Sequence, residues 1–100
     1  MIYRGTTPKL KFKVKFDTSL LDKAYITFFQ KDRYAFEKDI TACEVEENSL
    51  IVKLSQSDTL KLVSKYPVII QIRALLNDGT SLASKYMEKE VHDVLKDGEI

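Results

Sequence analysis

The sequence is poor in the residues on which most disulfides, metal sites and catalytic sites depend. Its 100 residues include one cysteine, one histidine, three glycines, two prolines and no tryptophan. The single cysteine, Cys43, cannot form an internal disulfide, which is the usual support of small secreted domains. We therefore expect synthesis in a reducing cytoplasm.

The same scarcity argues against an enzyme. Cys43 and His92 are the only possible cysteine–histidine pair, and nothing in their spacing brings them together. Zinc needs three or four cysteine or histidine ligands, and three scattered glycines do not make a phosphate-binding loop. Asn77-Asp78-Gly79 supplies only a fragment of a calcium loop. We expect no catalytic residue, no cofactor and no metal.

Long apolar runs and a large net charge are also missing. No stretch of about 18 apolar residues occurs, and the first five residues lack the apolar core of an export signal, so we expect no membrane association. Sixteen basic and fifteen acidic residues leave a net charge of +1, too little for the positive field that usually attracts nucleic acid. The charge is uneven, because residues 1–23 carry six basic and two acidic side chains and residues 88–100 carry five acidic and two basic. We favour internal complementarity between these ends over head-to-tail contact between copies.

The sequence does contain the alternating pattern that is typical of β-strands. Lysines alternate strictly with apolar residues over positions 9–16, which predicts a half-buried strand. Lysines two apart on one face lie about 6.5–7 Å from each other, close to the spacing of phosphates along a single nucleic-acid strand. The row is therefore a candidate polyanion contact: Lys9, Lys11, Lys13 and Lys15. The aromatic residues Phe12 and Phe16 fall on the opposite face, so we favour solubility and edge protection over nucleic-acid binding.

Further runs of β-branched, aromatic and aliphatic residues are separated by turn signals. They predict strands at 24–30, 34–39, around Cys43 and Val45, 50–54, 68–76 and 82–92. The last two are joined by a hairpin at Asn77-Asp78-Gly79-Thr80.

Other local signals indicate turns and one helical turn. Ser19 is a candidate cap for a turn after the first strand, and Asn48 fits a turn position with positive φ. Ser55 and Asp58 resemble a capping box that begins a short helix or 3₁₀ turn within residues 55–64.

Taken together, these elements predict one all-β domain over residues 1–100, with flexible terminal segments at 1–8 and 96–100. Seven short strands and a single helical turn are typical of an immunoglobulin-like or fibronectin-type antiparallel β-sandwich. A small open β-barrel is the alternative. Tyr66, just before the sixth strand, is a candidate tyrosine corner whose hydroxyl would bond the backbone a few residues upstream.

Three segments of the sequence resemble one group of proteins. Its opening Ile2-Tyr3-Arg4-Gly5-Thr6-Thr7-Pro8, its segment Gln71 to Thr80 and its closing Val94 to Ile100 are similar to short proteins encoded among the structural genes of phages and prophages of Gram-positive gut bacteria. More distantly, the chain resembles the immunoglobulin-like N-terminal modules of upper baseplate proteins. The resemblance implies synthesis in a bacterial cytoplasm and a place in the virion or baseplate, without a catalytic residue.

We therefore expect a structural or assembly module that contacts copies of itself or other phage structural proteins, as a homo-oligomer or part of a larger assembly. The segments flanking the predicted sheets are the candidate docking elements, because they could order on contact: Arg4, Gly5, Thr6, Thr7, Pro8, Lys96, Asp97, Gly98, Glu99 and Ile100. Two alternatives stay open. One is an independent binding module for a host surface polymer, and the other is single-stranded nucleic-acid binding by the lysine row.

Overall fold

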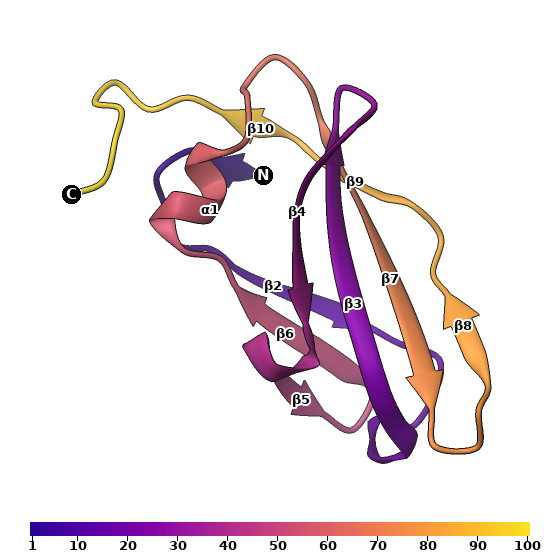
Figure 1. Cartoon of the computed structure of the whole chain (residues 1–100). Coiled ribbons are helices and arrows are strands. Elements are labelled where there is room, and N and C mark those ends of the chain that lie inside the picture. Colours follow the sequence, from indigo (N-terminus) through magenta and orange to yellow (C-terminus); the bar gives the residue numbers. More distant parts are fainter.

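The structure, a computed structural model, describes residues 1–100 and contains two antiparallel β-sheets packed face to face (Figure 1). The first sheet has the strand order β2 (Lys9–Lys13), β6 (Ser49–Lys53), β5 (Cys43–Glu46). The second has the order β4 (Arg33–Asp39), β3 (Leu21–Gln30), β7 (Val68–Leu76), β8 (Ser81–Ala83), and β9 (Met87–Lys89) also pairs with β7. The prediction of an antiparallel all-β sandwich is confirmed.

Small elements complete the fold. A parallel pair is formed by β1 (Ile2–Tyr3) and β10 (Val91–His92). Helical turns are η1 (Thr18–Leu20), η2 (Ile40–Ala42) and α1 (Gln56–Leu60). A bilayer-spanning helix needs about 20 residues, and no helix in this structure reaches that length with an apolar sequence.

The strand order differs in one respect from that of an immunoglobulin constant domain. There, the first, second, fifth and fourth strands share one sheet. Here, leaving the short β1 aside, the second strand in chain order is β3, and it lies in the other sheet between β4 and β7. This placement makes β3 and β7 the two central strands of the larger sheet, as predicted for residues 68–76.

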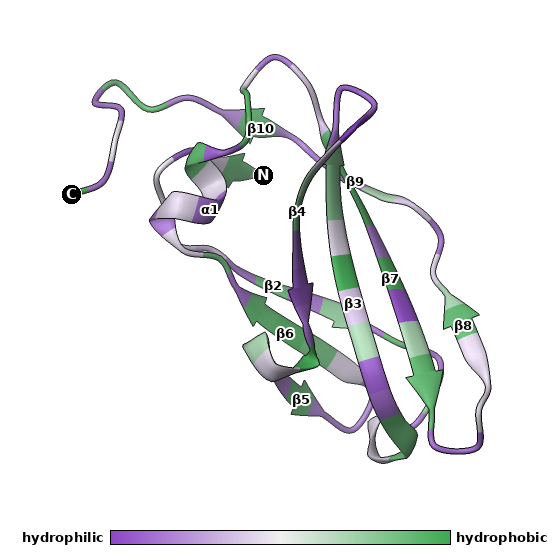
Figure 2. Ribbon diagram, viewed as in Figure 1, coloured by the Kyte–Doolittle hydropathy of each residue, from purple (hydrophilic) through white to green (hydrophobic).

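Alternating apolar residues of both sheets form the core. Leu10 and Phe12 face inward from β2, and Ile26 and Phe28 face them from β3. Phe28 stacks on Phe36 of β4, with ring centroids 4.4 Å apart. In Figure 2 the strands carry hydrophobic bands, whereas the β3–β4 and β7–β8 connections are hydrophilic.

Two local predictions are confirmed at atomic detail. The Ser55 hydroxyl accepts from the Asp58 N–H, and the Asp58 carboxylate accepts from the Ser55 N–H, so the capping box begins α1 as expected. The hairpin after β7 is also present, although only Gly79 has positive φ, at +89°. Its turn is closed by the Gly79 N–H, which donates to the Leu76 carbonyl at 2.9 Å. The Asp-Gly pair favours a two-residue primed turn, but the Leu76 N–H donates to the Thr80 carbonyl at 2.8 Å, so the loop is longer than two residues.

Two turn predictions and one strand boundary are wrong. Asp17, not Ser19, caps the turn before β3, because its carboxylate accepts the Ser19 N–H at 2.9 Å. Asn48 does not adopt positive φ; that conformation falls on Lys31 and Asp32 in the β3–β4 hairpin. The first strand ends at Lys13, since the chain bends after Val14 to cross to the other sheet.

The predicted last strand, 82–92, is broken into β8, β9 and β10. Ser84 causes the first break, because its hydroxyl accepts the Ile72 N–H at 2.9 Å and takes the place of a ladder partner. The second break follows Lys89, the partner of Val68. The residue before Val68 is Pro67, which has no N–H to extend the ladder. The segment after Lys89 therefore separates from β7, and its next strand, β10, pairs with β1.

The tyrosine-corner prediction is also wrong. The Tyr66 ring is half exposed and lies under the Lys31 ammonium, 4.7 Å from it, and its hydroxyl makes no hydrogen bond within the chain. The buried side chain of Gln30 holds this loop instead. Its amide donates to the carbonyls of Val63 and Tyr66 at 2.6 and 2.8 Å, and its oxygen accepts the Val63 N–H.

Candidate functional site

The two terminal segments predicted to dock partners meet at one end of the sandwich, beside α1 (Figure 1). The Arg4 side chain joins them: it donates to Leu62 O at 2.7 Å and Leu60 O at 3.2 Å, and it pairs with Asp97 at 2.6 Å and Asp93 at 3.3 Å. Since Arg4 is basic and both aspartates belong to the acidic C-terminal stretch, the opposite charges of the two ends meet within one molecule.

The other predicted docking residues lie around this contact. Gly5 has a φ of +77°, and a Cβ there would come within 3.3 Å of the Gly98 carbonyl oxygen. The Thr6 carbonyl accepts from Thr59 of α1 at 2.9 Å, and the Ile100 N–H donates to Gln56 at 2.8 Å. The exposed remainder is Thr7, Lys96 and Glu99, while Pro8 is half-buried beside β2. Apart from the exposed Thr7, Lys96 and Glu99, the residues predicted as docking elements thus contact the fold itself.

The lysine row is exposed on the outer face of the first sheet. Lys9, Lys11 and Lys13 project from β2, and Lys15 lies in the bend beyond it. Phe12, between them, is only 4% exposed and belongs to the core. It is unavailable for stacking on bases, which weighs against single-stranded nucleic acid as the partner.

A surface that the sequence did not single out lies on the outer face of the second sheet. Its centre is a strip from β3 and β7, which we call the outer-face strip: Tyr25, Phe29, Ile69, Arg73 and Leu75. Phe29 lies opposite Ile69, and Tyr25 lies opposite Arg73; the polar pair Thr27 and Gln71 lies between them on the same face. Tyr25 is 42% exposed and Phe29 37%.

Polar residues border the outer-face strip. Asp39 and Glu37 of β4 lie on one side, opposite Tyr25 and Thr27, and Glu88 of β9 lies on the other, opposite Ile69. The signal for this strip was present in the sequence, because apolar residues of β3 and β7 occur at both odd and even positions. Such runs are typical of strands with two covered faces, yet here only one face is covered.

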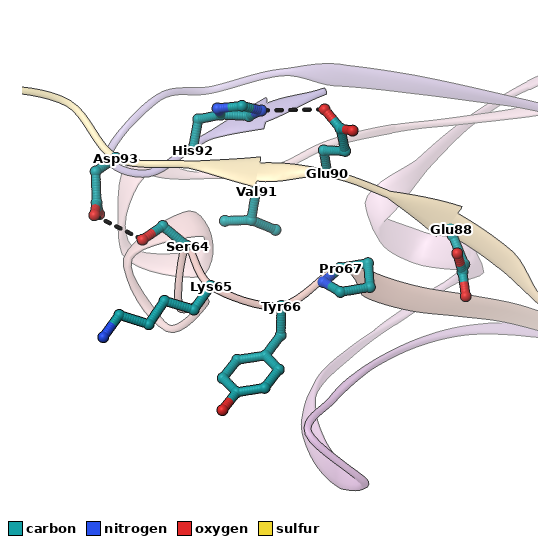
Figure 3. A pocket seen from close by; sticks show the side chains of 9 residues that line it. All are labelled: Ser64, Lys65, Tyr66, Pro67, Glu88, Glu90, Val91, His92 and Asp93. Atoms are coloured by element: carbon teal, nitrogen blue, oxygen red, sulfur yellow. Dashed lines mark hydrogen bonds and ion pairs between the residues drawn. The ribbon is translucent and has the colours of Figure 1, made fainter.

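An open, polar groove of about 600 Å³ lies near α1, between the loop that precedes β7 and the segment leading into β10 (Figure 3). The Asp93 carboxylate accepts from the Ser64 hydroxyl at 2.6 Å, and this bond, together with the charges of Arg4 and Lys65, lowers the pKa of Asp93. The Tyr66 ring points away from the strand in Figure 3. The groove therefore offers hydrogen-bonding groups and one exposed aromatic ring.

The remaining chemistry-bearing residues lie apart. Cys43 is in β5 and His92 is in β10, at opposite ends of the molecule in Figure 1. Burial, with the nearby Asp39 charge, raises the pKa of the Cys43 thiol, which disfavours the reactive thiolate. The His92 ring is tilted by 42° against the Tyr3 ring, with centroids 5.6 Å apart, and His92 Nε2 lies 3.2 Å from Glu90 Oε2. No three or more histidine, cysteine or acidic side chains are grouped in a way that could hold a metal ion.

Comparison with known protein families, with curated proteins and with solved structures finds no match for this chain.

Proposed function

We propose that this chain is a non-enzymatic structural or assembly module of a phage virion or baseplate, which acts by contacting other phage structural proteins or copies of itself. The observation that carries the proposal is the outer-face strip, in which aromatic, aliphatic and arginine side chains lie on both sides of the polar pair Thr27 and Gln71, with acidic residues at the border. The cores of protein interfaces have this composition, with tyrosine, phenylalanine and arginine enriched and acidic residues kept to the rim. The phage setting rests on the sequence resemblance.

The rigidity of the strip supports the same proposal. Tyr25 and Phe29 stand on β3, which is paired along both edges, and each faces a partner on β7. A backbone already paired on both edges needs no ordering when a partner binds, so more of the contact energy appears as affinity. A surface formed by loops would lose more conformational freedom on binding.

The experiment is a binding measurement with the structural proteins encoded by the genes beside its own. Tyr25→Ser and Phe29→Ser should each weaken the complex by about 30-fold if these residues are central anchors. Tyr86→Ser is the matched control, because Tyr86 is 73% exposed and lies outside the strip. Equal affinities for all three variants and the unchanged protein would contradict the proposal.

The polar groove favours a second candidate, binding of a host surface polymer. Its exposed Tyr66 ring beside hydrogen-bonding carboxylates suits a hydroxyl-rich ligand, and it lies at one end of the sandwich, as expected for a loop-borne site. A glycan array tests this candidate directly. A hit that Tyr66→Ser abolishes and Tyr25→Ser leaves unchanged would favour the groove over the strip.

A further inference from the structure

The first sheet has a free edge that carries the lysines. The main-chain groups of Pro8 and Val14 hydrogen-bond to the β6 side of β2. Main-chain groups alternate in direction along a strand, so those of the intervening odd-numbered residues point to the free edge: Lys9, Lys11 and Lys13. We call this the lysine edge.

The opposite edge of the same sheet carries glutamates. Glu44 and Glu46 of β5 pair with Ile51 and Ser49 of β6 and point to the same outer face as Lys11. Val45 lies between them, is 47% exposed, and turns its main-chain groups to the free edge. We call this the glutamate edge. The surrounding segment 37–47 has five acidic residues and one basic, whereas 9–15 has four lysines and no acid.

Most of these charges are unpaired within the molecule. Lys11 reaches across the sheet to Glu46 at 3.0 Å. No ion pair within the chain involves Lys9, Lys13 or Glu44. The two edges therefore present opposite charges to whatever lies beside them.

The strand directions set how two copies could meet. Both β2 and β5 run antiparallel to β6, so they are parallel to each other. A second copy in the same orientation can place its lysine edge beside the glutamate edge of the first. Two lysine edges, or two glutamate edges, would instead set like charges against each other.

We propose that copies of this chain associate side by side, with the lysine edge of one copy against the glutamate edge of the next. The inference rests on the proposed function as an assembly module and specifies a second copy as one partner. Because the contact joins two different surfaces, it repeats from copy to copy and gives a ring or an open filament.

The test is a charge swap followed by sedimentation velocity over a range of protein and salt concentrations. One variant carries Lys11→Glu and Lys13→Glu, a second carries Glu44→Lys and Glu46→Lys, and a third combines all four changes. Each of the first two should weaken self-association about tenfold or more, because both edges then carry the same sign. The third should regain it, and the first two should associate when mixed.

A control with Lys61→Glu and Lys65→Glu changes the net charge as much as the first variant but lies after α1, and it should self-associate like the unchanged protein. The inference is overturned if the unchanged protein stays monomeric, or if the four-residue variant associates no better than the two-residue variants. Neither result touches the proposed function, since binding of other structural proteins through the outer-face strip is measured separately.

Discussion

At the scale of single residues, Asp58 is the carboxylate most firmly enclosed by the fold. Its side chain accepts from the Lys38 ammonium at 2.7 Å and from the Ser55 N–H at 2.9 Å. Burial alone would raise the pKa of Asp58, but the hydrogen bonds from Lys38 and Ser55 outweigh it, and the pKa is lowered. Asp58 therefore links α1 to β4 as an ion.

Asp58→Asn should lower the free energy of unfolding at pH 7 by about 1–3 kcal/mol. A lowered pKa in the folded state means that the Asp58 contribution is complete above the unfolded pKa of about 4 and is lost as the pH falls through the folded value. The difference between the two proteins should therefore shrink below about pH 4. Urea titrations across this range measure it, with the exposed Asp22→Asn as control. A difference that grows on acidification would contradict the assignment.

Arg4 is the second residue whose contribution can be measured. Arg4→Ala should lower the free energy of unfolding by about 2 kcal/mol, because two carbonyls and two aspartates lose a charged donor. Arg4→Lys should recover less than half of this, since an ammonium lacks the planar fork that reaches several acceptors at once. Arg33→Ala, at an exposed arginine without a partner, is the control. Equal stability of the Arg4→Ala and Arg33→Ala variants would show that the terminal contact contributes nothing.

Whether the role of a single residue could be predicted depended on how far apart in the sequence the interacting residues lie. The capping box at Ser55 and Asp58 was predictable because both partners lie within one turn. The roles of Gln30 and Arg4 were not, because their acceptors lie 33 and 56 or more residues away in the chain. Because Gln30 is so far from this loop in the sequence, its hydrogen bonds to the loop before β7 could not be predicted, and that role was assigned to Tyr66 instead.

At the scale of elements, the β3–β4 hairpin turns on two non-glycine residues with positive φ, Lys31 at 54° and Asp32 at 58°. Aspartate tolerates this left-handed conformation better than branched residues do. The hairpin therefore stores a small strain that substitution can relieve or increase.

Asp32→Gly should raise the free energy of unfolding by about 0.5 kcal/mol, whereas Asp32→Val should lower it by about 1–2 kcal/mol. Thermal unfolding separates the two, since 1 kcal/mol shifts Tm by about 4–8 °C in a domain of this size. Glu47→Val, in the β5–β6 turn where φ is not positive, should change Tm little. Equal Tm values for the glycine and valine variants at position 32 would contradict the turn geometry.

Elements were predictable where the pattern was periodic and uncertain where one side chain interrupted it. Strands β2, β3, β6 and β7 followed from alternation and β-branched runs. The break between β8 and β9 did not, because it depends on the Ser84 hydroxyl entering the ladder beside Ile72. No local sequence signal distinguishes that serine from one on an exposed strand face.

At the scale of the whole molecule, the sandwich presents different surfaces on its different sides. The larger sheet carries the outer-face strip, and the smaller sheet has lysines along one edge and glutamates along the other. The fold class followed from the sequence, but these surfaces did not, because they depend on which strands are neighbours. The placement of β3 between β4 and β7 assembles the strip, and the placement of β6 between β2 and β5 separates the charges.

Light scattering coupled to size-exclusion chromatography tests whether this chain acts by protein–protein contact. The protein is run alone over a range of concentrations, and then with each structural protein encoded beside it. We expect a species heavier than the 11.5 kDa chain, formed by copies of the chain or with at least one of those proteins. Tyr25→Ser or reversal of one charged edge should reduce its amount. A mass of one chain under every condition would contradict the proposed function.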